Sequence, residues 1–205
     1  MNPILRFAVT LTLVFASSAF AADEDFKPLF NGKDTAGWHV RRTDRPSLWK
    51  VEDGVLKNDL KTGEHGVDLV TDVKFWNFTV RYEYMVPDGS NSGFYLRGRH
   101  EIQILGDYKE GKPTLTGNGA IYNFKAADVW AGKPGGEWQT VEATIIGNKI
   151  TVRLNGQIIH DKVECDKATG SELDKNVTEP GSIFLQGDHG AVSFRKIEIK
   201  ELPKE

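Results

Sequence analysis

Residues 91–104 read NSGFYLRGRHEIQI, and this stretch decides the fold predicted for the 205-residue chain. Apolar and polar side chains alternate on both sides of Gly98, which predicts two adjacent strands with a turn at that glycine. Successive side chains of a strand point to opposite faces, so Glu101 and Gln103 share one face and Ile102 and Ile104 share the other. We expect the isoleucine face to pack on a core. The opposite face is then either plain solvent surface or the floor of a groove.

Side chains that can bind hydroxyl groups or carry protons gather in and around this stretch. They are Asn91, Arg97, His100, Glu101, Gln103 and Asp107. Such a cluster favours the groove over the plain surface, because a strand that merely faces solvent needs no particular set of polar groups.

The rest of the chain shows the same β pattern. Turn pairs such as Asn-Gly and Asp-Gly separate short alternating runs, and no 12-residue window has a helical period. Strands are expected at 48–56 (as a hairpin), 69–71, 76–86, 120–124, 138–146, 149–154, 157–159, 182–186 and 191–202. The polar segment 161–180 is expected to be irregular, with room for one short helical turn. The spacing of the turn signals predicts an all-β sandwich or jelly roll.

The first 21 residues have the pattern of a secretory signal peptide. A short charged start is followed by an apolar run from Phe7 to Phe15 and by small residues up to Ala21. The run is shorter than the ~20 residues of a membrane-spanning helix, so no membrane span is expected. We therefore expect a signal peptide over 1–21, cleavage near Ala21, and a single domain over 22–205 in the periplasm or outside the cell.

Charge and cysteine content narrow the classes of partner and site. The net charge is −3 with both signs interspersed, which argues against a nucleic-acid partner. Cys165 is the only cysteine, so the chain can form no internal disulfide and no cysteine-based metal site.

Several short motifs follow one another along nearly the whole chain after residue 28. They are LFNGKD (29–34) with GW (37–38), WKVEDGVL (49–56), FTVRYEY (78–84), NSG (91–93), LR (96–97), EIQI (101–104), GAIY (119–122), LNG (154–156), IFLQ (183–186), HG (189–190) and FR (194–195). In content and order they resemble the 3-keto-disaccharide hydrolase domain family. The resemblance implies a concanavalin A-like jelly-roll β-sandwich of two curved antiparallel sheets. It also implies an exported enzyme whose substrate is a carbohydrate, a disaccharide or glycoside already oxidised to a ketone at C3 of the sugar.

A ketone at C3 makes the hydrogen on C2 acidic, so a base can remove it and the glycosidic oxygen can leave from C1 before water adds back. This path needs a base, a group that stabilises the C3 oxygen, and a proton donor for the leaving group. We expect Glu101 to be the base, Arg97 to stabilise the oxyanion and His189 to carry protons. The residues expected to bind substrate are Asn91, Gln103, Asp107, His65, Trp130 and Gln186.

A divalent metal is an alternative way to stabilise the C3 oxygen. Glu101, Gln103 and His189 offer a carboxylate, an amide oxygen and an imidazole, which suit a weakly bound Ca, Mn or Zn ion.

Other interpretations stay open from the sequence. Arg97 and Glu101 are also placed for a plain salt bridge between neighbouring strands, and His65 for a plain loop residue. His100 is placed for a structural role on the core side, whereas His39 and His160 are expected at the surface. A non-catalytic, lectin-like carbohydrate-binding module is the alternative function. An ordinary glycosidase is disfavoured, because its two carboxyls must lie about 5–9.5 Å apart, whereas Glu101 and Asp107 on a straight strand would be ~20 Å apart.

Overall fold

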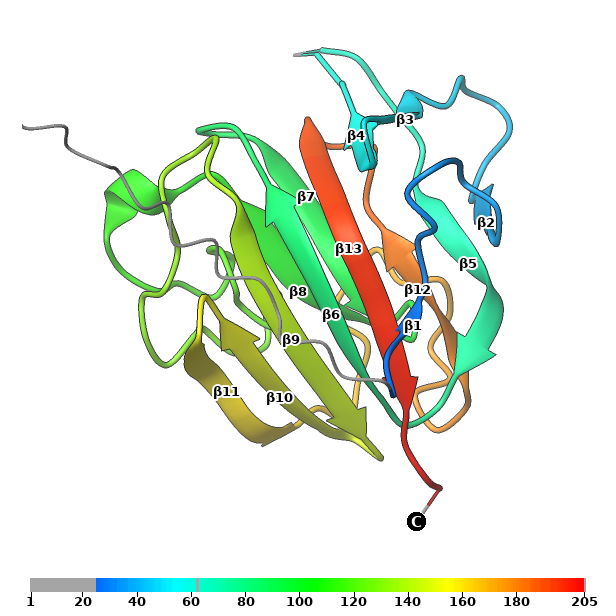
Figure 1. The fold of residues 1–205 in the computed structure, drawn as a ribbon. Helices are drawn as coiled ribbons and strands as arrows, with labels where there is room; N and C mark the ends of the chain where they lie inside the picture. Colours follow the sequence, from blue (N-terminus) through cyan, green and yellow to red (C-terminus); the bar gives the residue numbers. More distant parts are fainter. Residues whose placement is uncertain (1–24, 62, 205) are drawn as a thin grey trace, which may run out of the picture.

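The computed structural model describes residues 25–61 and 63–204, which form two antiparallel sheets packed face to face. Figure 1 shows the two layers. The predicted all-β class and two-sheet sandwich are confirmed. The expected signal peptide, residues 1–21, lies outside the described residues. Within the part of the chain that is described, no helix has the length and apolar character needed to cross a membrane.

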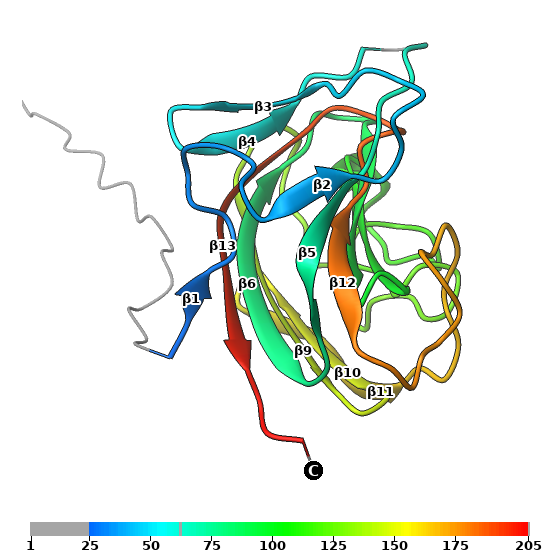
Figure 2. The ribbon, with the colours of Figure 1, turned by 90° about the vertical axis from the view of Figure 1, so that its right-hand side faces the viewer.

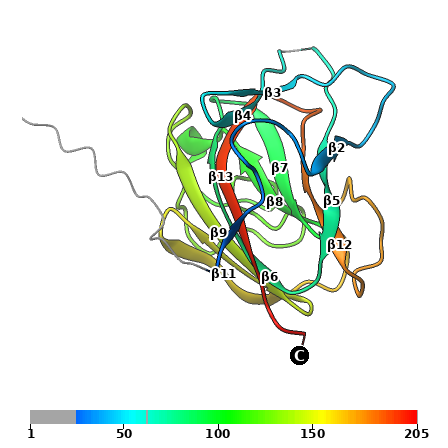
Figure 3. The ribbon, with the colours of Figure 1, turned by 45° about the vertical axis from the view of Figure 1, so that its right-hand side comes forward.

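The larger sheet has the strand order β11-β10-β9-β6-β13-β4-β3, and β1 pairs with β13. Its strands are β1 (Lys27–Pro28), β3 (Trp49–Glu52), β4 (Val55–Asn58), β6 (Phe78–Met85), β9 (Gln139–Ile146), β10 (Lys149–Leu154), β11 (Gln157–Glu164) and β13 (Val192–Glu201). Figure 3 shows β1 running beside β13. In Figure 2 this sheet curves around the smaller one.

The smaller sheet has the order β2-β5-β12-β7-β8. Its strands are β2 (Trp38–Val40), β5 (Leu69–Phe75), β7 (Asn91–Leu96), β8 (His100–Leu105) and β12 (Gly181–Leu185). The stretch 91–104 forms the β7–β8 hairpin, as predicted, and its turn uses positive φ at both Arg97 and Gly98. The hairpin places β8 at the edge of the sheet.

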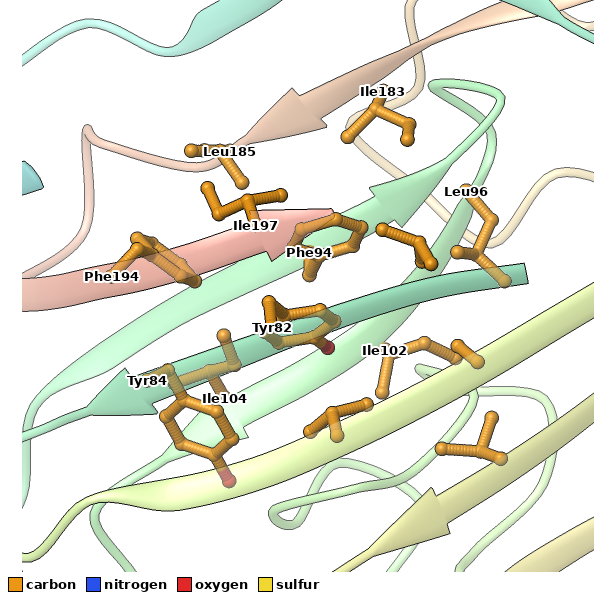
Figure 4. Close-up of a cluster of buried hydrophobic side chains, with 14 of the residues drawn as sticks. Tyr82, Tyr84, Phe94, Leu96, Ile102, Ile104, Ile183, Leu185, Phe194 and Ile197 are labelled. Atoms are coloured by element: carbon orange, nitrogen blue, oxygen red, sulfur yellow. The ribbon is translucent and has the colours of Figure 1, made fainter. Parts of the chain in front are cut away.

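The core lies between the two sheets and follows from the alternation of side chains. Ile102 and Ile104 of β8 are buried in it, which confirms the predicted isoleucine face. Tyr82 of β6 stacks on Phe94 of β7 (Figure 4). The ring centroids are 4.0 Å apart and the ring planes are 5° from parallel. Aromatic contacts of this kind stabilise the packing of the two sheets beyond the buried area alone.

Three local predictions are corrected by the structure. Segment 120–124 is no strand, because only Ile121 makes bridges, to Ile102 and Lys125. β11 extends to Glu164, since its pairing with β10 continues through a register shift. The one short helical turn lies at Tyr108–Glu110, ahead of the loops that follow β8, and not in 161–180.

His160 is also not a surface residue. Its ring is fully buried beside β10, and Nε2 lies 2.8 Å from the carbonyl oxygen of Gly119. Burial lowers the pKa of His160, so the ring is neutral near pH 7.

Candidate active site

The candidate site lies on the outer face of the smaller sheet, away from the core. In the β7–β8 hairpin Tyr95 pairs with Glu101, and on the other side of β7 Tyr95 pairs with Phe184 of β12. The rings of Tyr95 and Phe184 stack with centroids 3.8 Å apart. Val70 of β5 completes this outer apolar cluster, and Leu173 packs over it. The outer face of the smaller sheet therefore carries a second, smaller cluster of packed apolar side chains.

Glu101 is buried on this face, with 3% of its surface exposed. Its carboxyl crosses the neighbouring strand at Gly93, where an added Cβ would lie 2.3 Å from Oε1. Only a residue without a side chain leaves room for the carboxyl there. The interpretation of the Glu/Gln face as plain solvent surface is wrong.

Burial raises the pKa of Glu101 to about 7, because removing water disfavours the charged form. The hydroxyl of Tyr95 and the imidazole of His189 lower this pKa, whereas the carboxyls of Asp188 and Asp68 raise it. The hydroxyl of Tyr95 is buried and has no hydrogen-bond partner among the described residues. A carboxyl that titrates near neutrality can act as an acid or a base at physiological pH.

His189 lies in the β12–β13 connection. Its imidazole interacts with the carboxyls of Glu101, Asp188 and Asp68, and we call these four groups the electrostatic cluster. Its Nδ1 lies 2.5 Å from Oδ1 of Asp188, and this hydrogen bond raises the pKa of the imidazole. The charge of Glu101 raises it further. The side chain is 46% exposed, so the imidazole is accessible to a ligand.

Two buried side chains fix the connection that carries His189. Asn58 Nδ2 donates to the carbonyl oxygens of both Gly187 and Gly190, each at 3.0 Å. Asp68 Oδ1 accepts the N–H of Gly187 at 2.9 Å. These hydrogen bonds hold the backbone on both sides of His189, although the residue lies in a loop.

Arg41 and Asp68 belong to the site and were missed by sequence reasoning. Asp68 is buried, which raises its pKa, and its Oδ2 lies 3.4 Å from Nη1 of Arg41. Arg41 also donates to the carbonyl oxygens of Ser171 and Glu172, at 2.8 and 2.9 Å. It therefore ties β2 to the segment 165–180, which Figure 2 shows on the side of β12 away from the larger sheet.

The segment 165–180, which we call the strap, covers one side of Glu101. Thr169 Oγ1 accepts the N–H of Glu101 at 2.9 Å, and the N–H of Leu173 donates to the carbonyl oxygen of Gly98. Arg99 holds the strap through a two-pronged contact with Asp174, at 2.7 and 3.1 Å. These bonds account for the burial of Glu101 at the edge of its sheet.

Arg97 does not lie with Glu101, and its predicted roles as oxyanion stabiliser or salt-bridge partner are corrected. Its guanidinium donates to the carbonyl oxygens of Trp76 and Gly147, at 2.7 and 2.8 Å, and stacks 3.7 Å from the Trp76 ring. The positive φ at Arg97 turns the side chain out of the strand alternation. Arg97 joins the β5–β6 and β9–β10 turns to the β7–β8 hairpin. Trp76 is half-buried beneath this guanidinium.

We predict that Arg97→Ala lowers the free energy of unfolding by about 3 kcal/mol or more, because it leaves buried carbonyl groups without donors. The rate of turnover per folded molecule should stay within about twofold. Denaturant titration and an activity assay, with Arg153→Ala as the exposed control, measure both. A large loss of turnover in a protein of unchanged stability would return Arg97 to the site.

The other predicted substrate-binding residues fall into two groups. Gln186 and Asn91 lie near Glu101: the N–H of Gln186 donates to the carbonyl oxygen of Gly93, and Asn91 begins the strand that contains Gly93. Each has a buried side-chain oxygen with no partner among the described residues. Gln103 shares the face of Glu101, but its amide already bonds to Thr116 O and to the N–H of Ile104.

The remaining three are not gathered around Glu101 by any contact in the structure. Asp107 Oδ2 accepts the N–H of Asn118 and so braces the 107–118 loop. Trp130 is half-buried in a segment whose neighbour Ala131 bonds to Asn155, at the β10–β11 turn of the larger sheet. His65 is exposed in the β4–β5 connection.

The metal site expected at Glu101, Gln103 and His189 stays a prediction. The amide oxygen of Gln103 accepts the N–H of Ile104 at 3.1 Å. Among residues 25–61 and 63–204, no group of three or more His, Cys, Asp or Glu side chains is arranged to hold an ion.

A cleft of about 570 Å³ opens beside His189. Its walls come from the β4–β5 connection, the β6–β7 turn and the β12–β13 connection. The lining residues include Leu60, Glu64, Pro87, Asp88, Ser90 and Ala191. Glu101 does not line it, so His189 is the group that the cleft and the electrostatic cluster have in common.

The raised pKa of Glu101 has a consequence for stability. A carboxyl with a higher pKa in the folded protein binds its proton more tightly when folded, so the free energy of unfolding falls as pH rises from about 4.5 toward about 7. The loss amounts to about 3 kcal/mol. We predict that Glu101→Gln equals the wild type at pH 4 and exceeds it by up to that amount at pH 8. Denaturant titrations at both pH values test this; a constant difference would contradict the raised pKa.

The chain is similar to a family of known proteins and to a curated member of known activity. Residues 25–200 match the model of a family described as a 3-keto-alpha-glucoside-1,2-lyase-like domain. The chain is 34% identical over 160 residues to a 3-keto-disaccharide hydrolase of Bacteroides thetaiotaomicron, a match that covers 63% of this chain. The chain spans about half (54%) of the length of that curated relative.

Solved structures share the fold. A candidate glycosyl hydrolase from Parabacteroides distasonis superposes with a TM-score of 0.71 and 27% identity, covering 87% of this chain and 84% of that one. A β-1,3-1,4-glucanase (lichenase) from a mouse hindgut metagenome gives a TM-score of 0.51 at 13% identity, covering 86% and 97%. The second likeness concerns the fold alone, and it confirms the predicted jelly roll.

Proposed function

Because the chain belongs to the 3-keto-alpha-glucoside-1,2-lyase-like domain family, we propose that it cleaves 3-keto-glycosides by removing the C2 proton with Glu101. The observation that carries the proposal is the buried carboxyl of Glu101, whose pKa is raised to about 7, on a face that also presents the imidazole of His189, whose pKa is raised by Asp188. Such a pair supplies a base and an acid at one pH.

In the first step the Glu101 carboxylate takes the proton from C2 of the sugar. The electrons of the C2–H bond form a C2–C3 double bond, and the C3 carbonyl oxygen becomes an oxyanion. Tyr95 acts as a positioning residue, because its hydroxyl favours the charged form of Glu101 and lies beside the carboxyl. Since the rate depends on the ionised form of Glu101, activity should rise with pH toward about 7.

In the second step the oxyanion returns its electrons, so that the C3 carbonyl re-forms, a C1–C2 double bond appears and the C1–oxygen bond breaks. The imidazolium of His189 gives its proton to the departing oxygen. Water then adds its oxygen to C1 and gives a proton to the now neutral His189, while Glu101 returns its proton to C2. The net reaction is hydrolysis, and release before water addition makes the same site a lyase.

The proposal needs neither a second carboxyl at glycosidase spacing nor a metal ion. Asp188 supports the acid by raising the pKa of His189. Asn91 and Gln186 contribute buried, unpartnered oxygens that can accept hydrogen bonds from sugar hydroxyls. Export to the periplasm or the outside is part of the proposal and rests on the signal-peptide pattern of residues 1–21.

A direct assay tests the function. The protein is incubated with a 3-keto-disaccharide and, separately, with the unoxidised parent disaccharide, and the released sugar is measured. We expect release from the keto sugar alone, because only the ketone acidifies C2. Binding of unoxidised glycans in calorimetry, together with no release from any keto sugar, would instead favour the lectin-like alternative.

A further inference from the structure

We propose that the cleft beside His189 binds the leaving half of the substrate, a neutral pyranose, while the oxidised half lies at Glu101. The inference rests on the proposed function and adds to it the place and chemical class of the leaving group. It starts from the position of His189, which lines the cleft and also belongs to the electrostatic cluster around Glu101.

The order of groups along the face follows the order of bonds in the substrate. The C2 proton must meet Glu101, the glycosidic oxygen must meet the proton donor, and the leaving sugar must lie beyond that donor. Glu101 does not line the cleft, whereas His189 does. An imidazole between a carboxyl and a cleft therefore matches a glycosidic oxygen between two sugars.

The size and surface of the cleft suit a sugar ring. Its volume of about 570 Å³ falls within the ~300–1,000 Å³ of sites for small molecules. Leu60, Pro87 and Ala191 offer apolar surface, and Glu64 and Ser90 offer oxygen atoms. A pyranose presents the same mixture of C–H faces and hydroxyl edges.

The charges around the cleft favour a neutral ligand. Asp88 is neutralised by Lys109, with Nζ 2.7 Å from Oδ2, and its Oδ1 accepts the N–H of Gly135. Lys61 and Glu64, which line the opposite wall, carry opposite charges. Neither sign dominates, so an anionic or cationic leaving group would gain nothing from this wall.

One wall of the cleft is already built in the free protein. Ser90 Oγ donates to the carbonyl oxygen of Ala191 at 2.8 Å, which ties the β6–β7 turn to the β12–β13 connection. Gly190 packs so closely on this turn that an added Cβ would lie 2.4 Å from Ser90 Oγ. Asn58 Nδ2 also donates to the carbonyl oxygen of Gly190 in this connection. The cleft is thus a standing feature and does not need substrate to form.

Ala191→Trp tests the assignment by filling the cleft from its fixed wall. Two substrates are compared: a 3-keto-disaccharide and methyl 3-keto-glucoside, whose leaving group is too small to use the cleft. We expect kcat/KM for the disaccharide to fall about tenfold to a hundredfold, mainly through KM. The methyl glycoside should be cleaved at the wild-type rate. Ala36→Trp, at an exposed alanine before β2, is the matched control.

Each outcome decides a separate question. Wild-type protein that cleaves neither substrate overturns the proposed function itself. Wild-type protein that cleaves both, with Ala191→Trp equally active or equally impaired on both, overturns the cleft assignment alone. Should Ala191→Trp unfold, Glu64→Trp on the opposite exposed wall serves as the second variant, with the same expected selectivity and the same overturning result.

Discussion

Replacing Glu101 by Gln is expected to lower kcat for a 3-keto-disaccharide by about 10²- to 10⁴-fold, the range that a general base contributes. The amide keeps the shape that crosses Gly93 but cannot take a proton from C2. KM should change little, since the variant keeps the contacts that bind the sugar. Steady-state kinetics at pH 7.5 measure the loss.

The control for this variant is Glu137→Gln, at an exposed carboxylate in the loop before β9. It should retain full activity. The loss in Glu101→Gln should occur without any loss of stability, because the variant no longer buries a charge. An active Glu101→Gln variant would mean that another group takes the proton.

Replacing His189 by Ala is expected to slow cleavage of a 3-keto-disaccharide by about 10²-fold, because a sugar alkoxide leaves poorly without a proton donor. A 4-nitrophenyl 3-keto-glucoside should lose far less, since nitrophenolate leaves without protonation. In the wild type, activity on the disaccharide should also fall at high pH, above the raised pKa of His189. The alanine variant should lose this dependence.

His39→Ala is the matched control, because His39 is also an exposed imidazole paired with a carboxylate, Asp72, at 2.6 Å. It lies at the β2 edge of the sheet, and Glu101 lies at the opposite edge, on β8. Equal losses in both variants, or an equal loss on both leaving groups in His189→Ala, would contradict the role of His189 as acid.

Much of the fold was predictable because it follows from local pattern. Alternation in residues 78–84 and 101–104 places one set of side chains in the core, and Asn-Gly or Asp-Gly pairs mark the hairpins. The errors lie where pairing across the sheet decides the structure. β11 continues through polar residues to Glu164 because β10 offers it hydrogen bonds, and alternation does not report that.

The site was predictable only in part, for a related reason. Glu101 lies on a strand whose outer face follows from the alternation of side chains, and His189 lies in a glycine-flanked loop, so the sequence alone suggests both as candidates. Arg97 was misplaced because one turn residue with positive φ breaks the parity. Arg41 and Asp68 reach the site through contacts with segments more than 100 residues away, for which the local sequence has no signal. Asp188 directly precedes His189 in the sequence, so its pairing with the imidazole could have been predicted.

The central claim, removal of the C2 proton during cleavage, is tested most directly by a single-turnover comparison of the normal 3-keto-disaccharide with one carrying deuterium at C2. Breaking this bond in the catalytic sequence predicts slower cleavage of the deuterated substrate by the wild-type enzyme. Identical single-turnover rates for the two substrates would contradict it and point to direct displacement at C1.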